Sequence, residues 1–139
     1  MTVKHTLAQL MLALASCALL LSGCMLVSGG QSSSDALPDG GNISASFVGA
    51  DGSSVQTVST GLANATLSAT VIVQAERGEL QVSLLAPDSS VALVVRGRPQ
   101  ESVSRTGTVA TDAEGNLRYR VSAEGARNGS YQVFYQRGP

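Results

Sequence analysis

The feature that most constrains this chain is an alternation of apolar and polar residues that recurs between Ile43 and Tyr135. Successive side chains of a β-strand point to opposite faces, so a period of two is typical of a strand with one buried face. Beyond Gly41, no segment carries the sustained 3.6-residue stripe of an amphipathic helix. The pattern therefore predicts an all-β fold.

The alternating segments are short and are separated by turn residues. Clear alternation covers residues 43–47, 67–75, 80–84, 117–123 and 131–135, and weaker alternation covers residues 55–59 and 105–111. A continuous apolar run at residues 91–95 suits either a central strand covered on both faces or a strand at an interface. About eight strands with this spacing are typical of a sandwich or small barrel. We predict a single antiparallel β-sandwich over residues 42–139.

Two of the predicted hairpins are similar to each other. Residues 73–82 and residues 121–133 each place a charged, glycine-containing stretch between two strands with apolar inner faces. Either an internal duplication or the shared requirements of a hairpin turn would produce this likeness. Both segments are therefore expected to be hairpins.

A different pattern occupies residues 1–23. Lys4 is the only lysine of the chain, and residues 7–21, which follow it, contain no charged residue. A basic segment followed by an apolar segment of this length is typical of a signal peptide. We predict that residues 1–23 are a helical signal peptide.

The apolar segment ends in Leu21-Ser22-Gly23-Cys24, which resembles the lipobox of bacterial lipoprotein precursors. The resemblance implies that the Cys24 thiol receives a diacylglycerol group. It also implies that a dedicated signal peptidase recognises Leu21, Ser22 and Gly23 and cleaves before Cys24. A second lipobox-like match ends at Cys17, and an uncleaved transmembrane anchor over residues 7–27 is a further alternative.

The lipobox resemblance also implies a location and a membrane partner. Two or more acyl chains make membrane binding durable, so the mature protein is expected in the bacterial cell envelope, outside the cytoplasm. Met25 stands where an Asp is the usual inner-membrane retention signal, which favours the outer membrane in a diderm organism. Residues 28–41 are rich in Gly and Ser and lack periodicity, which predicts that residues 24–41 are the lipidated cysteine and a flexible linker.

The composition from Cys24 onward excludes several functions. This part contains no His, Lys or Trp, and Cys24 is its only cysteine. It therefore cannot build a Ser-His-Asp or Cys-His nucleophile, a Cys/His zinc site, a disulfide or a haem site. Eight Arg against ten Asp and Glu give a net charge of about −2, which argues against nucleic-acid binding. No carboxylates stand at a catalytic or calcium-binding spacing, so we predict no catalytic residue, metal or cofactor, and no enzyme.

Two features of the strands are candidates for a partner surface. Phe134 lies on the polar face of its strand, where it could be an exposed anchor for a partner or be covered by the linker or a loop. Several arginines flank predicted strands and could converge into an anion-binding patch or form a solvated face. These arginines are Arg96, Arg98, Arg105, Arg118 and Arg120.

The order of strands and turns between Gly78 and Tyr135 resembles small secreted β-sandwiches of the bacterial pre-peptidase C-terminal type. Because a fold does not determine a function, the functional prediction rests on the residues. We predict a membrane-anchored, non-enzymatic binding or scaffolding module with an envelope protein as its partner. The alternative is an accessory domain for glycans or small ligands, which usually stack on exposed aromatic side chains.

Overall fold

The computed structural model describes residues 24–139, and this part of the chain consists of seven β-strands joined by turns and loops. Residues 1–23, which hold the predicted signal peptide with Leu21, Ser22 and Gly23, lie outside the described residues. Within the described part, no helix is long and apolar enough to cross a membrane. The strands are β1 (Leu26–Ser28), β2 (Gln31–Leu37), β3 (Gly40–Ser59), β4 (Thr66–Leu85), β5 (Val91–Arg96), β6 (Val103–Ala110) and β7 (Asn116–Arg137).

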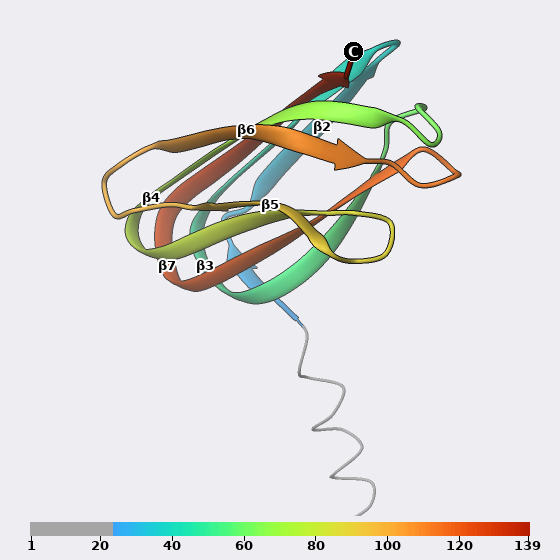
Figure 1. Ribbon diagram of the computed structural model, residues 1–139. Helices are drawn as coiled ribbons and strands as arrows, with labels where there is room; N and C mark the ends of the chain where they lie inside the picture. The colour runs from blue at the N-terminus through green and yellow to red at the C-terminus, as the bar shows by residue number, and fades with distance from the viewer. Residues whose placement is uncertain (1–23) are drawn as a thin grey trace, which may run out of the picture.

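All seven strands belong to one antiparallel sheet that folds over into two layers (Figure 1). The three long strands, β3, β4 and β7, pair along almost their whole length, in the order β3-β7-β4. Each of them runs through one layer, bends, and continues in the other. The predicted antiparallel β-sandwich is therefore confirmed, although its two layers share their central strands.

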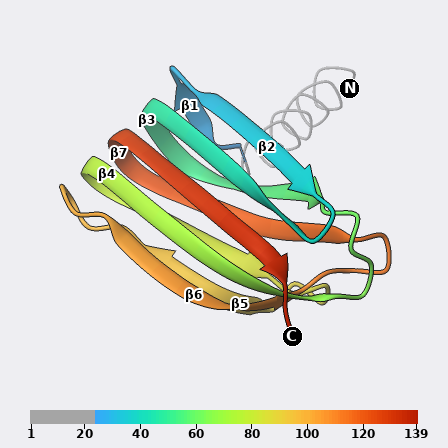
Figure 2. The same ribbon diagram turned by 90° about the horizontal axis from the view of Figure 1, so that it is seen from above.

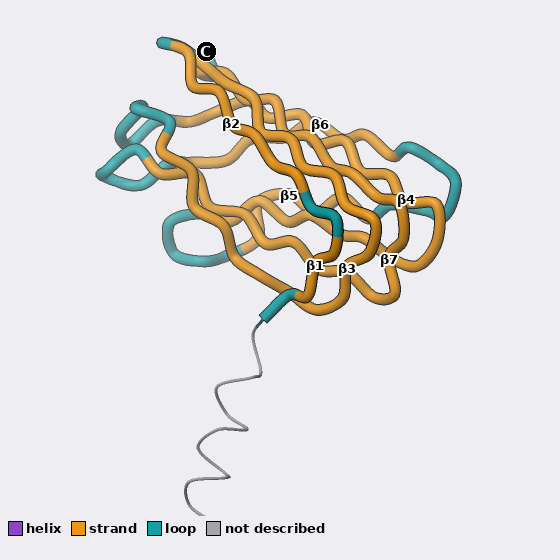
Figure 3. Tube along the Cα trace, turned by 180° about the vertical axis from the view of Figure 1, so that it is seen from behind, coloured by secondary structure: helices purple, strands orange, loops and turns teal. Residues whose placement is uncertain are grey.

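The two layers differ in their outer strands. The first layer contains β2, residues 40–50 of β3, residues 126–137 of β7, residues 66–77 of β4, and β6, and these strands lie side by side in Figure 2. The second layer contains residues 52–59 of β3, residues 116–123 of β7, residues 79–85 of β4, and β5. Strand β1 pairs with β3 at the bend, at the end of the molecule from which the chain enters the sandwich (Figure 3).

Glycines with positive φ angles mark the three bends. Gly52 of β3 has φ 101°, Gly78 of β4 has φ 75° and Gly125 of β7 has φ 55°. The pairing register shifts between Ala50 and Gly52, and again between Arg77 and Glu79. An extra residue in one strand, held by a glycine in the left-handed region, is how a bulge bends a strand and increases its twist.

The bends correct two of the sequence predictions. Residues 73–82 and 121–133 are not hairpins, because each is a continuous strand that crosses between layers. Residues 55–59 likewise belong to β3 and form no separate strand. Three pairs of expected strands thus merge into β3, β4 and β7, and with β1 and β2, which were not expected, the described part has seven strands where about eight were predicted. A charged, glycine-containing stretch between alternating segments is common to a hairpin turn and to a glycine bulge, so the sequence pattern does not distinguish them.

The predicted linker is also corrected by the structure. Within residues 24–41, β1 pairs with β3 from Leu26 to Ser28, and β2 pairs with β3 in unbroken register from Gln31 to Leu37. Every residue of β2 is exposed, so backbone pairing rather than an apolar face holds this edge strand. A segment without apolar alternation therefore still forms a strand, since an existing edge supplies its hydrogen-bond partners.

The apolar run at residues 91–95 forms β5, which pairs only with β4 and lies at an edge of the second layer. Val91 and Val94 are 51% and 38% exposed, whereas Val95 is fully buried. The prediction of a central strand covered on both faces is therefore wrong. The alternative, a strand at an interface, stays a prediction.

The core lies between the two layers and consists of the inward side chains of the long strands. Alternation along β4 buries Leu67, Val71 and Val73 in the first layer and Leu80 and Val82 in the second, each with no exposed surface. Strand β7 contributes Tyr119 and Tyr131, whose rings pack edge to face with centroids 5.9 Å apart. This packing leaves the opposite face of each layer to solvent.

Candidate functional site

The outer face of the first layer brings Phe134 to the centre of a five-stranded surface. Register places Asn42 of β3, Phe134 of β7, Thr70 of β4 and Thr106 of β6 side by side in one row across the sheet. On the three central strands the inward neighbours of this row, such as Val133, Val71 and Ile43, are buried, so the row faces solvent. The Phe134 side chain is 42% exposed. We call this surface the neutral face.

Hydroxyl and amide side chains dominate the neutral face. The Thr70 and Thr106 hydroxyls hydrogen bond across β4 and β6 at 2.8 Å, and the Ser33 and Ser44 hydroxyls do so across β2 and β3 at 2.8 Å. Its other members on the three central strands and β6 are Ser46, Ser68, Ile72, Gln74, Ser104, Thr108, Ser130, Gln132 and Gln136. Among the described residues, two charged side chains share this face: Asp35 on the edge strand β2, and Glu76 of β4, which lies near the bend and accepts from Asn128 Nδ2 at 2.7 Å. Solvated protein faces usually carry many interspersed charges, so a neutral face of this size is unusual.

A hollow of about 650 Å³ adjoins Phe134 at the end of the first layer where β2 turns into β3. Leu37, which is 65% exposed, and Pro38 form one side of the hollow, and Phe134, Thr70 and Gln136 form another. Asp39 and Arg137 form an ion pair at the same end of the sheet, with 3.6 Å between Asp39 Oδ1 and Arg137 Nε. The hollow therefore combines apolar walls with hydroxyl and amide groups.

Asn42, the register neighbour of Phe134, has a buried amide oxygen, Oδ1, with no hydrogen-bond partner within residues 24–139. An unpaired buried carbonyl oxygen costs free energy that a hydrogen-bond donor would recover. This unpaired oxygen lies buried beneath the neutral face, beside Phe134 in register.

The predicted alternatives for Phe134 are decided by the position of β2. Phe134 was expected either to anchor a partner or to be covered by the linker or a loop. Strand β2 lies beside β3 in the plane of the sheet and leaves the ring exposed. Whether a partner binds there remains a prediction.

Three of the five predicted arginines, Arg96, Arg118 and Arg120, share the outer face of the second layer, which we call the arginine face. Register places Arg120 opposite Val55 and Ser83, and Arg96 opposite Gln81. Arg118 lies two residues from Arg120 on the same face of β7, so its guanidinium is a near neighbour. Glu79 and Glu124 share this face where it meets the bend, but no described carboxylate forms an ion pair with these three arginines. The half-exposed Val55 and Val94 lie among the arginines.

The contacts of these arginines are with neutral groups. Arg96 donates to Gln81 Oε1 from Nε at 3.2 Å and from Nη2 at 3.1 Å, and Arg118 Nη1 donates to Ser89 Oγ at 3.0 Å. Arg98 lies apart, in the β5–β6 connection, where its Nη1 is 3.7 Å from Glu101 Oε2. The structure therefore gathers Arg96, Arg118 and Arg120, and places them on the opposite side of the sandwich from Phe134.

A cleft between the two layers was not found by sequence reasoning. It has a volume of about 300 Å³ and is lined by Phe47, Tyr119 and Tyr131 from the core and by Met25 from the N-terminal segment. The two tyrosine hydroxyls are 3.4 Å apart, and burial raises the pKa of both phenols. Both tyrosines stand at ordinary apolar positions of an alternating strand, so the sequence contains no signal that separates them from the core.

Several carboxylates of the described part serve turns and ion pairs. Asp112 Oδ1 accepts from the backbone N–H of Asn116 at 2.8 Å and of Glu114 at 3.0 Å, which lowers the pKa of the Asp112 carboxyl. The pKa of Asp88 is lowered by the hydroxyl and backbone N–H of Ser90. Within residues 24–139, no group of three or more Cys, Asp or Glu side chains is placed to hold a metal ion. These carboxylates are stabilised as anions, which is the opposite of what a general acid needs.

No protein-family description matches the chain, and no curated protein matches it. A carbohydrate-binding module from Cellvibrio mixtus lichenase 5A, in complex with cellotriose, is 14% identical, with 82% of this chain and 91% of that chain covered and a TM-score of 0.39. The Clostridium thermocellum endo-1,4-beta-D-xylanase 10B structure with xylohexaose is 13% identical, with 82% and 26% covered and a TM-score of 0.44. A Bacillus endospore appendage structure is 11% identical, with 84% and 96% covered and a TM-score of 0.49.

Proposed function

We propose that this chain is a non-enzymatic binding module, anchored by acyl chains on Cys24 in the bacterial cell envelope, that binds a neutral glycan on its neutral face. The observation that carries the proposal is the exposed Phe134 ring at the centre of an array made mainly of hydroxyl and amide groups. Sugar rings stack on exposed aromatic rings, and neutral hydroxyls and amides can both donate to and accept from sugar hydroxyls.

Further features of the face support a neutral ligand of extended shape. The hydroxyl rows run across five strands, which at about 4.8 Å per strand is wide enough for several sugar rings. The hollow beside Leu37 and Phe134 gives one end of a chain a place to enter.

The test is affinity electrophoresis of the mature protein through gels that contain soluble neutral polysaccharides, namely β-glucan, xylan and mannan in separate gels. We expect one of them to retard the protein, and we expect Phe134→Ala to abolish the retardation. Val94→Ala on the arginine face is the matched control, because Val94 is exposed to a similar degree, 38% against 42%, and it should migrate like the unaltered protein. Retardation that survives Phe134→Ala would contradict the proposed face.

A second candidate function, scaffolding through an envelope protein, is favoured by the arginine face. Three guanidiniums that form no ion pair with a described carboxylate, beside exposed valines, suit a partner with an acidic rim and an apolar centre. In-cell crosslinking of the tagged, lipidated protein, followed by mass spectrometry, tests this function. One near-stoichiometric partner that is lost in an Arg118→Ser, Arg120→Ser double variant would identify it, and retention of that partner in Phe134→Ala would separate the two faces.

A further inference from the structure

The structure joins the candidate acylation site directly to the folded domain. Cys24 is exposed, and β1 begins at Leu26, which pairs with Asp51 of β3. The Cys24 carbonyl oxygen lies so close to Gly52 that a Cβ added to that glycine would be 2.9 Å from it. No linker therefore separates Cys24 from the sandwich, and acyl chains on Cys24 would bring the bilayer to this end of the molecule.

The surface around Cys24 is apolar. Leu26 is 73% exposed, Val48 is 58% exposed and Val27 is 50% exposed, and the three line a shallow hollow of about 330 Å³ with Gly49 and Ala50. We call this surface, residues 24–28 with residues 48–52, the anchor end. Three aliphatic side chains exposed side by side form an apolar patch of the kind that marks an interaction site.

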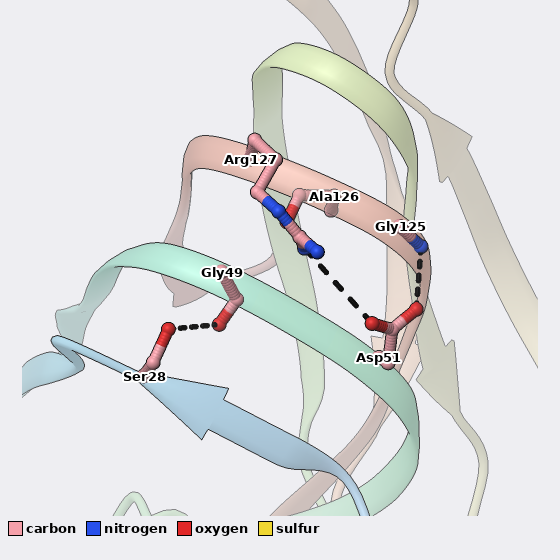
Figure 4. Close-up of polar contacts among 6 residues, drawn as sticks. All are labelled: Ser28, Gly49, Asp51, Gly125, Ala126 and Arg127. Carbon is pink, nitrogen blue, oxygen red and sulfur yellow. Dashed lines mark hydrogen bonds and ion pairs between the residues drawn. The ribbon is translucent and has the colours of Figure 1, made fainter.

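The polar groups of the anchor end are satisfied within the protein (Figure 4). Asp51 Oδ1 accepts from the backbone N–H of Gly125 at 2.6 Å, and Asp51 Oδ2 is 3.9 Å from Arg127 Nη1. Ser28 Oγ donates to the Gly49 carbonyl at 3.5 Å. Because the charge of Asp51 faces Arg127, the contacts that remain for a partner are mainly those of the aliphatic side chains.

We propose that the anchor end rests on the bilayer, with Leu26 and Val48 inserted at the level of the lipid headgroups. The inference rests on the proposed acylation of Cys24. Once the acyl chains hold Cys24 at the membrane, contact of Leu26 and Val48 with lipid is intramolecular, so even a weak apolar patch is occupied. The membrane surface is therefore the partner that fits this patch.

This orientation determines where the neutral face lies. Strand β7 extends from Arg127 at the bend to Phe134, and seven residues of extended strand span about 23 Å. A sandwich that stands on its anchor end therefore holds Phe134 and its hollow away from the lipid headgroups, where a glycan can reach them. The domain acts at a set height rather than over the range of a flexible tether.

The test uses tryptophan fluorescence, because the chain contains no Trp and each introduced residue reports alone. Three single variants are prepared: Leu26→Trp, Val48→Trp and Phe134→Trp. Each is expressed from the full precursor, isolated as the processed, acylated protein, and placed in phosphatidylcholine vesicles whose acyl chains carry bromine, which quenches tryptophan fluorescence on contact. We expect strong quenching and a blue-shifted emission at positions 26 and 48, and neither at position 134. In the Leu26→Trp protein, Val48→Asp should reduce the quenching, whereas Val94→Asp on the arginine face should leave it unchanged.

Two outcomes would overturn the proposal, and they are distinguishable. If the protein floats with the vesicles but positions 26 and 48 are quenched no more than position 134, the domain is anchored and does not dock. If the protein does not float with the vesicles at all, the acylation fails and the docking fails with it. Vesicle flotation is thus measured on every variant.

Discussion

Thr60 and Thr111 are two of the few buried polar residues in the described part of the chain. Thr60 Oγ1 donates to the Gly115 carbonyl at 2.7 Å and accepts from the Leu62 N–H at 3.1 Å. Thr111 Oγ1 donates to the Leu62 carbonyl and accepts from the Ala65 N–H at 2.9 Å. The two hydroxyls join the β3–β4 loop to the β6–β7 loop at the end of the sandwich opposite the bends.

We expect Thr111→Val to lower the free energy of unfolding by about 1 to 3 kcal/mol, because it leaves the Leu62 carbonyl and the Ala65 N–H without this partner in a buried site. Urea denaturation measures the change. Thr108→Val is the matched control, since Thr108 is exposed on β6 and its substitution should change stability by about 0.5 kcal/mol or less. Equal effects of both substitutions would show that the buried hydroxyl does not stabilise the loops.

The tyrosine pair predicts an alkaline limit to stability. Burial raises the pKa of Tyr119 and Tyr131 in the folded protein above the value of about 10 that a phenol has in an unfolded chain. A raised pKa in the folded state contributes stability that is fully present below about pH 10 and is lost as the pH rises toward the folded pKa. No lysine in residues 24–139 titrates alongside them.

We therefore expect the melting temperature to fall between about pH 9 and pH 11.5, within the range set by the phenol pKa. The Tyr119→Phe, Tyr131→Phe double variant should show a shallower fall, because a phenylalanine has no phenol to ionise. Calorimetry across this pH range checks the slope. A slope in the double variant equal to that of the unaltered protein would assign the alkaline transition to other groups.

At the scale of the elements, the bends explain why three strands can build both layers. Gly78 of β4 packs so closely on the backbone of Gly125 in β7 that a Cβ would contact the Glu124 and Gly125 carbonyls. Gly125 itself has open space where a Cβ would lie, and only its φ of 55° disfavours a side chain. The two bends therefore require glycine for different reasons, close backbone packing at Gly78 and a positive φ angle at Gly125.

Alanine substitutions at Gly78 and Gly125 should therefore destabilise the protein to different extents. Gly78→Ala should lower the free energy of unfolding by roughly 3 kcal/mol or more, since it adds a backbone clash to the cost of a positive φ. Gly125→Ala should lower the free energy of unfolding by only about 1 to 2 kcal/mol, because the alanine must adopt the left-handed conformation but meets no clash. Chemical denaturation of both variants compares them, and equal losses would mean that close packing at Gly78 is unimportant for the bend.

At the scale of the whole molecule, the sandwich has three surfaces of different chemistry. The neutral face carries Phe134, the arginine face carries Arg96, Arg118 and Arg120, and the anchor end carries Leu26 and Val48. The two faces cover opposite sides of the sandwich, and the anchor end lies at the bends. A single small domain can therefore be held by one surface and bind with another.

The anchoring itself is tested at Cys24. We expect Cys24→Ala to abolish labelling with radioactive palmitate and to leave unprocessed or soluble protein, because the thiol proposed to receive the lipid is removed. Cys17→Ala is the matched control and should label like the unaltered protein. Undiminished labelling of the Cys24→Ala variant would instead place the lipid on Cys17 or elsewhere.

The sequence by itself determined the residues that alternate between core and solvent, because the period of a strand is a local property of the backbone. Exposure of Phe134 could be predicted as one of two alternatives for the same reason. Whether a glycine stretch closes a hairpin or bends a strand depends on which strands pair across it, as at Gly78 and Gly125. The tertiary structure alone decided between a hairpin and a bend at these glycines. It also decided that residues 31–37 form β2, because an exposed segment with no apolar face becomes a strand only where a sheet edge supplies its hydrogen-bond partners.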